Sequence, residues 1–214
     1  MAVGHLRGAF RAVLRFVASV LMVSGALLVL DATATLVWQE PISAVIASTG
    51  QSALEGQLSE LPSGGGDLAA GASALARRAE RGRAAGRITM PTLDRSYVIV
   101  QGVGTSALRK GPGHYSETAF PGQGRTVAIA GHRTTYMAPF RRVNRLRRRQ
   151  PVVLEMPYGR FTYRVEKTRI VPPTATEVTR DVSYDRLVLT ACHPLYSAAE
   201  RIVVFARLER AEPV

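Results

Sequence analysis

Residues 187–208 read LVLTACHPLYSAAERIVVFARL, and the pattern of this stretch decides the fold that we expect. An apolar run at 187–189 leads to Cys192, which is the single cysteine of the chain. A second apolar run, at 202–205, begins directly after Arg201. Two short apolar runs joined by a short loop are typical of a β-hairpin. The hairpin would place the thiol and the guanidinium at the same end of two paired strands.

A reactive thiol needs a base, and His132 is the best placed of the four histidines in the chain. It comes just after the apolar run 126–130, so it lies at the predicted exit of a strand, as Cys192 does. A lone histidine or cysteine is more often structural than catalytic. Both residues at strand exits, with Arg201 placed to join them, favour a catalytic site.

The motifs AGHR at 130–133 and TACHP at 190–194, with Arg201 after them, resemble those of the sortases, the cysteine transpeptidases of Gram-positive cell surfaces. The Cys-His-Pro tripeptide and its spacing to Arg201 look most like class E and related actinobacterial sortases. The resemblance covers about residues 86–210. It implies an all-β fold, a sortase-like closed barrel of about eight strands with short helices.

The resemblance also implies an activity and its partners. The reaction would cleave an LPXTG-like sorting signal between Thr and Gly, and the likeness to class E suggests an LAXTG variant. The substrates would be surface proteins that carry such a signal. The acceptor would be an amine, either of a lipid II-like peptidoglycan precursor or of a pilin lysine.

The expected catalytic residues are His132, Cys192 and Arg201. Cys192 would attack the scissile carbonyl and form a thioester, and His132 would protonate the departing amine and then deprotonate the incoming one. Arg201 would donate hydrogen bonds to the oxyanion or hold the substrate backbone, which a guanidinium can do at any physiological pH. No acidic residue stands out in the sequence as an orienter for His132, so we expect slow turnover.

Further side chains are candidate contacts for the substrate. His193 adjoins Cys192, but adjacent residues of an extended chain point to opposite sides, so a direct catalytic role is less expected of it. The segment 110–115 is rich in Gly and Pro, which predicts either a tight loop on the barrel surface or a wall of the substrate groove. The predicted substrate-binding residues are His114, Tyr115, Thr134 and His193.

The N-terminal region predicts a membrane anchor. Residues 1–15 carry three arginines and no acid, and residues 16–38 carry one charge, Asp31. A spanning helix needs roughly 20 residues, and positive charge on its N-terminal side places that end in the cytoplasm. We therefore expect a single-pass protein of the cell membrane with an extracellular catalytic domain. A cleaved signal peptide, with its cleavage site at 32–34, is the alternative.

The composition changes twice after the anchor. Residues 39–85 are rich in Ala, Gly and Ser and show only a loose helical spacing, which we interpret as a helical or flexible stalk. A helix packed on the barrel is the alternative for this region. Residues 86–210 form short apolar runs separated by Gly, Pro and polar turns, which favours a sandwich or barrel as the catalytic domain.

Charge and composition limit the remaining functions. The formal net charge of +12 indicates an anionic partner. Six arginines cluster in residues 141–149 without the interleaved aromatic residues that stack on bases, so we expect no nucleic acid. No spacing of ligand residues suits a metal, and no cofactor is expected. A non-enzymatic, membrane-anchored binding module for anionic cell-wall polymers stays the alternative, and an exported thiol-dependent hydrolase of another kind is a third hypothesis.

Overall fold

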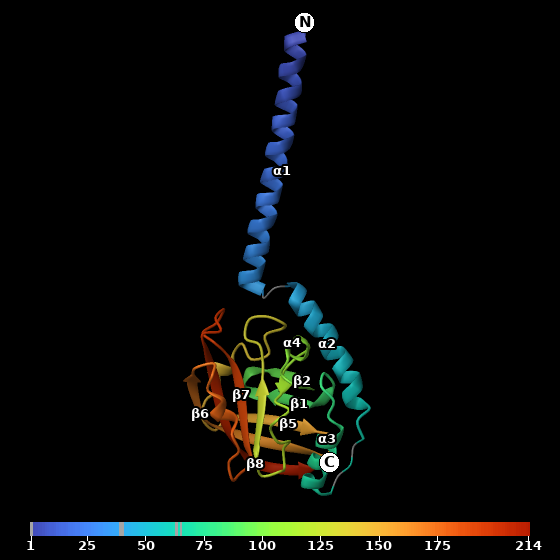
Figure 1. The fold of residues 1–214 in the computed structure, drawn as a ribbon, viewed down its shortest axis with the longest axis vertical. Coiled ribbons are helices and arrows are strands. Elements are labelled where there is room, and N and C mark those ends of the chain that lie inside the picture. Colours follow the sequence, from blue (N-terminus) through green and yellow to red (C-terminus); the bar gives the residue numbers. More distant parts are fainter. Residues whose placement is uncertain (1, 39–40, 63, 65) are drawn as a thin grey trace. The chain divides into compact units, whose positions relative to one another are not determined.

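The structure is a computed structural model that describes residues 2–38, 41–62, 64 and 66–214 (Figure 1). Residue 1 of the predicted cytoplasmic segment and residues 39, 40, 63 and 65 of the predicted stalk lie outside the described residues. The chain forms two compact units, Met1–Pro41 and Ile42–Val214.

Most of the first unit that the structure describes is the helix α1 (Ala2–Trp38). Within it, Phe10–Ala34 is long and apolar enough to cross a membrane, with a mean hydropathy of 2.3. A signal sequence near an N-terminus has the same length and composition. The helix therefore suits both alternatives that the sequence leaves open, the anchor and the cleaved signal.

The second unit is built around a closed barrel in which the strands follow the order β1-β2-β3-β4-β7-β8-β6-β5 (Figure 1). This arrangement confirms the predicted all-β, sortase-like closed barrel. The β4–β7 and β2–β3 pairs are parallel, and the other neighbours are antiparallel. The strands are β1 (Ala84–Met90), β2 (Arg95–Gln101), β3 (Gly113–His114), β4 (Thr126–Ala130), β5 (Pro151–Met156), β6 (Gly159–Val171), β7 (Arg186–His193) and β8 (Glu200–Pro213).

Side chains of β7 alternate between the barrel interior and an outer layer. Leu187, Leu189 and Ala191 belong to the large cluster that gathers buried side chains from most of the strands, which is the interior core. Val188 belongs to a separate cluster, formed by β4, β6, β7 and β8 and covered by side chains of the β6–β7 connection. Successive strand residues point to opposite faces. Cys192 therefore belongs to the outer face.

Helix α2 (Pro41–Ser59) packs on the barrel. Its residues Ala47 and Leu54 are buried. The side-chain amide of Gln51 accepts from the Val98 N–H at 2.8 Å and donates to the Val98 carbonyl at 3.0 Å. These bonds satisfy backbone groups of β2 that a neighbouring strand would otherwise satisfy. From Ile42 on, the structure thus has the packed helix that was the alternative to a stalk.

The remaining helices are short. Asp67 caps α3 (Leu68–Arg78), because its carboxylate accepts from the N–H groups of Ala69 and Ala70. Ala72 and Leu75 bury one face of α3 against the barrel core. The others are α4 (Thr105–Leu108) and the 3-10 helices η1 (Pro91–Leu93), η2 (Val143–Arg145) and η3 (Thr176–Thr179).

Candidate active site

Three strand ends bring the predicted catalytic residues together. The Gly131 N–H donates to the Thr190 carbonyl at 3.0 Å, so the parallel pairing of β4 with β7 continues up to His132. Because Ala130 pairs with Thr190, the segment that continues to His132 reaches the level of Cys192 near the end of β7. In the antiparallel β7–β8 pair, Cys192 stands directly opposite Arg201.

Two of the three residues also share one face of the barrel. Ala128 on β4, Val188 on β7 and Val203 on β8 all belong to the outer cluster. Cys192 lies four positions after Val188 on β7, and Arg201 lies two positions before Val203 on β8. His132 lies four positions after Ala128, two residues beyond the end of β4. An even spacing on a strand returns a side chain to the same face. Alternation thus places the thiol and the guanidinium on the outer face, and the continued β4–β7 pairing brings the segment of His132 to the same end of the three adjacent strands.

Burial controls the protonation of His132. The ring is half-buried, and burial lowers its pKa below the ordinary value of 6.5. Its centroid lies 5.1 Å from that of Tyr136, with the two planes tilted by 40°. Among the residues that the structure describes, no acidic side chain bonds the ring. The neutral imidazole is therefore favoured, and it can accept a proton from a thiol.

The loop that follows His132 has an unusual backbone. Residues 136–138 have φ angles of 52°, 59° and 41°, in the left-handed region that non-glycine residues rarely adopt. The Phe140 N–H donates to the His132 carbonyl at 2.9 Å, and the Tyr136 N–H donates to the Ser43 hydroxyl of α2 at 3.1 Å. Contacts at both ends of the loop hold this conformation.

Arg201 faces the end of β7 from the neighbouring strand. Its Nη1 donates to the carbonyls of Ala198 and Glu200, each at 2.9 Å, so the guanidinium helps to fix the β7–β8 loop. Its other N–H groups make no hydrogen bond to any described residue. They are donors available to a substrate oxygen. The predicted oxyanion role of Arg201 stays a prediction.

Arg133 is a site residue to which the sequence pattern gave no role. Its side chain is 4% exposed. Its Nη1 donates to the Cys192 carbonyl at 3.1 Å and to Nδ1 of His193 at 3.2 Å. The signal in the sequence was its place directly after His132, but nothing local in the sequence indicates that an arginine there is buried.

The structure does not place His114 at a substrate groove. Its ring is 2% exposed and stacks on Phe120 at 4.4 Å between centroids. Nδ1 lies 2.8 Å from the Gln101 side-chain oxygen, and Nε2 lies 2.9 Å from the Ala119 carbonyl. Both ring nitrogens are thus engaged inside the protein. The expected substrate contact is corrected to an internal structural role, because the two-residue strand β3 carries His114 into the barrel.

The hydrogen bonds of His114 also assign its tautomer. Burial lowers the pKa of the ring to about 4, so the ring is neutral near pH 7 and has one N–H. The Ala119 carbonyl can only accept, so it takes the proton of Nε2. Nδ1 then accepts, which requires the nitrogen of the Gln101 amide to face the ring. A rotation of the Gln101 amide group by 180° gives this orientation, because it exchanges the oxygen and the nitrogen and leaves the rest of the side chain in place.

The other predicted substrate contacts lie closer to the catalytic residues. The Tyr115 hydroxyl is 3.0 Å from the Thr190 hydroxyl, two residues before Cys192 on the same face. His193 is half-buried at the end of β7 and accepts from Arg133. Thr134 is half-buried in the loop after His132. For all three, substrate contact stays a prediction.

The arginine cluster at 141–149 divides into two parts. Arg141 is half-buried; its guanidinium lies over the Tyr196 ring at 5.9 Å, and its Nη2 is 3.3 Å from the Tyr196 hydroxyl. The other members are exposed, and no ion pair joins them to an acid within the described part of the chain. They are Arg142, Arg145, Arg147, Arg148 and Arg149.

The described residues contain no group of three or more His, Cys, Asp or Glu side chains placed to hold a metal ion. Cys192 is a free thiol and half-buried.

Comparison with known proteins gives this geometry a family. A family model for the sortase domain matches residues 88–209, which is more than half of the chain. The chain belongs to the sortase family. Sortase D of Bacillus subtilis (strain 168) is 32% identical over 132 residues, which cover 60% of this chain and 65% of that protein. Sortase SrtE1 of Streptomyces coelicolor is 27% identical over 150 residues, which cover 63% of this chain and 43% of that protein. This sortase thus matches less than two thirds of the length of either relative.

Solved sortase structures show the same fold. Sortase E from Streptomyces avermitilis superimposes with a TM-score of 0.58 at 34% identity, covering 63% of this chain and 93% of that one. A Clostridium perfringens sortase D5 transpeptidase gives a TM-score of 0.64 and covers 78% of this chain and 99% of that one. At 18% identity, this second likeness concerns the fold alone. Membership of the family, including its class E branch, agrees with the resemblance found in the motifs.

Proposed function

We propose that this sortase is a membrane-anchored cysteine transpeptidase that cleaves an LAXTG- or LPXTG-like sorting signal between Thr and Gly. It transfers the acyl group to an amine of a peptidoglycan precursor or a pilin. The observation that carries the proposal is the meeting of His132, Cys192 and Arg201 at adjacent strand ends. The sortase E1 structure from Streptomyces coelicolor, 26% identical with a TM-score of 0.58, has a tripeptide in its active site.

The proposed reaction has two acyl-transfer steps. The Cys192 thiolate attacks the carbonyl carbon of the Thr–Gly bond, and Arg201 donates hydrogen bonds to the oxygen that becomes negative. His132 as imidazolium gives its proton to the departing glycine amine, which leaves a thioester on Cys192. The acceptor amine then attacks the thioester and loses a proton to His132. Its attack releases the Cys192 thiolate.

The lowered pKa of His132 fits a slow enzyme. Departure of the amine requires imidazolium, whose fraction falls as pH rises through the pKa of the ring. Because burial lowers that pKa, the loss begins at a lower pH than for an exposed histidine. Only a minority of molecules then hold thiolate and imidazolium together near pH 7.

The test incubates the full chain in detergent with LAXTG and LPXTG peptides and an amine nucleophile, and identifies the products by mass. We expect a thioester adduct on Cys192 and a peptide joined to the amine. Cys192→Ala should abolish both, and His132→Ala should remove turnover. His193→Ala should lose less than either variant. If Cys192→Ala still joined peptide to amine, the transpeptidase proposal would fail, and a binding module for anionic polymers would become the better reading of the exposed arginines.

A further inference from the structure

Arg133 is a buried cation. Among the described side chains it is the one lysine or arginine that is buried, with 4% of its surface exposed. Removing a guanidinium from water carries a large free-energy cost unless hydrogen bonds and opposite charges compensate for it. The contacts around Arg133 should therefore show which groups compensate for the cost of burying its charge.

None of the hydrogen-bond acceptors of Arg133 is an acid. Nη1 donates to the Cys192 carbonyl and the His193 ring, and Nη2 donates to the Asn144 side-chain oxygen at 3.2 Å. Nη2 also lies 3.5 Å from the Arg141 carbonyl, at the limit of a hydrogen bond. No carboxylate pairs with the guanidinium in the described part of the chain. The Nη groups have acceptors, but the buried Nε has no partner among the described residues, and the positive charge is not neutralised.

The negative charge that this site can develop belongs to Cys192. Burial lowers the pKa of the Arg133 guanidinium; the charge of ionised Cys192 raises it, and neighbouring Arg141 lowers it. Attraction between two groups acts equally on both, so a cation that gains from a thiolate also favours that thiolate. A guanidinium remains charged through the pH range in which a thiol ionises.

We propose that Arg133 is a positioning residue for the nucleophile. Its hydrogen bonds join the end of β7 to the loop after His132, and its buried, unpaired positive charge stabilises the thiolate of Cys192. The link to turnover rests on the transpeptidase function proposed above. The geometry that carries the inference is one side chain that follows His132 and bonds the backbone of Cys192.

The same contact gives His193 a function. Arg133 can only donate, so Nδ1 of His193 accepts, and the proton of a neutral ring is on Nε2. His193 then serves as one acceptor that holds Arg133 in place. This role explains why a histidine beside the nucleophile need not act as the base.

The test measures alkylation of Cys192 by iodoacetamide as a function of pH, with the product counted by mass. It needs no peptide substrate, so its outcome is separate from that of the transpeptidase proposal. An opposite charge nearby shifts a thiol titration by about one unit or more. For Arg133→Met, we expect the midpoint of the alkylation profile to rise by about one pH unit, and the rate on its acidic side to fall about 10-fold.

Two comparison variants separate charge and geometry from general damage. Arg133→Lys keeps the charge but loses the planar fork, so its midpoint should lie between those of the native chain and Arg133→Met. Arg142→Met removes an exposed arginine of the same segment and should leave the profile unchanged. With the sorting-signal peptide, Arg133→Met should lower kcat more than it changes KM, because the nucleophile and not the binding surface is affected.

An unchanged profile in folded Arg133→Met would overturn the proposal. If that variant does not fold, Asn144→Ala and His193→Ala each remove one acceptor while Arg133 stays. We expect both to raise the midpoint by a smaller amount than Arg133→Met. Native profiles in both would show that Arg133 is only structural, and would equally overturn the proposal.

Discussion

At the scale of single residues, burial separates two histidines that have similar sequence settings. His114 and His132 each follow a glycine near a strand. His114 is 2% exposed, and burial lowers its pKa to about 4. His132 is only half-buried; burial lowers its pKa as well, but part of the ring stays open to solvent. His132 is therefore the ring of the two that remains open to solvent and to a substrate, as the proposed reaction requires.

The buried ring of His114 predicts how stability depends on pH. The unfolded ring takes up a proton near pH 6.5, while the folded ring stays neutral down to about pH 4. Stability is therefore complete above pH 6.5 and falls as the pH is lowered toward 4, by about 3 kcal/mol from this residue. In urea denaturation at a series of pH values, His114→Gln should show a flatter dependence in that window. His193→Gln is the control; an equal flattening there would contradict the assignment to His114.

Arg201 allows a test of geometry apart from charge. If it stabilises the oxyanion, Arg201→Ala should lower turnover roughly 100- to 1000-fold, equivalent to about 3 to 4 kcal/mol. Arg201→Lys keeps the charge without the planar fork, so its loss should also be substantial. The melting temperature should change little in either variant, because the two loop carbonyls that Arg201 bonds are exposed and water can replace the guanidinium there, at a cost of about 0.5 kcal/mol or less. Near-normal transpeptidation by Arg201→Ala would remove Arg201 from the site.

At the scale of elements, the β7–β8 hairpin could be predicted because its information is local. Two apolar runs joined by a short loop lie within one stretch of sequence, and Cys192 stands opposite Arg201 as the pattern indicates. Strand β3 could not be predicted, because it has two residues and is defined by pairing with β2 and β4. That missed strand is the reason why His114 looked like a loop residue.

The packing of α2 was only the alternative to a stalk, and the burial of Arg133 was not predicted, for a related physical reason. The sequence of α2 shows a loose apolar spacing, and its decisive contact is between Gln51 and Val98, which are 47 positions apart. Arg133 looked like an ordinary polar loop residue, because its acceptors come from β7 and from the segment before β5. Polar contacts between distant segments leave no periodic signal in a sequence.

The Gln51 contact gives a prediction for α2. Gln51→Ala leaves the Val98 N–H and carbonyl without their partner, and an unsatisfied backbone group in a partly buried position costs about 1 to 3 kcal/mol. We expect the free energy of unfolding to fall by that amount in urea denaturation. Ser52→Ala, at an exposed position of the same helix, should change it by about 0.5 kcal/mol or less. Equal stability of both variants would mean that water replaces Gln51 on β2.

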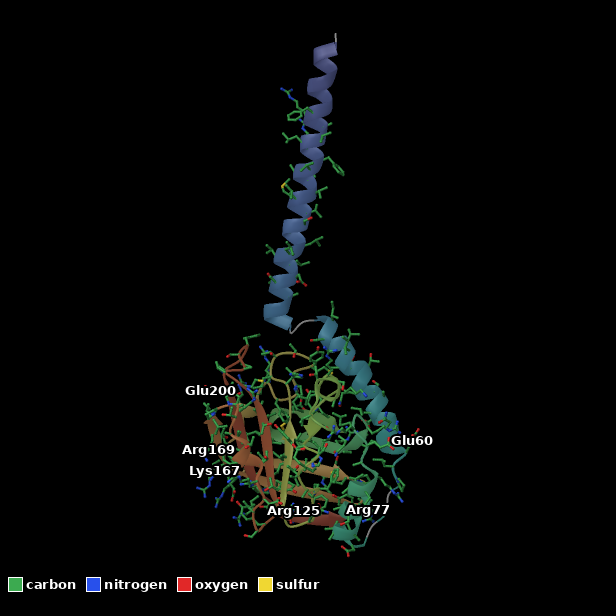
Figure 2. The ribbon with its side chains drawn as sticks, viewed as in Figure 1. Glu60, Arg77, Arg125, Lys167, Arg169 and Glu200 are labelled. Atoms are coloured by element: carbon green, nitrogen blue, oxygen red, sulfur yellow. The ribbon has the colours of Figure 1, made fainter. Side chains whose placement is uncertain are left out.

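At the scale of the whole molecule, charged side chains are numerous on the outer surface, whereas the chain has only one thiol. Lys167 and Arg169 of β6 and Glu200 of β8 are exposed at the outside of the barrel (Figure 2). Cys192 is the one cysteine of the chain. A thiol reagent therefore labels a single side chain. Whether a reagent that cannot cross the membrane labels it shows on which side of the membrane the catalytic unit lies.

This property gives a test of the proposed orientation. Arg7, Arg11 and Arg15 precede the apolar residues 16–37, so positive charge should keep the N-terminus in the cytoplasm and place the barrel outside. We expect the full chain to fractionate with membranes, and a membrane-impermeant maleimide added to intact cells to label it. Cys192→Ala should stay unlabelled, which controls for reaction at other side chains. Labelling only after lysis would place the barrel inside and contradict the orientation. An unanchored chain with a mature N-terminus at Thr35 would instead show that Ala32-Thr33-Ala34 is cleaved, so that the apolar helix serves export without serving as an anchor.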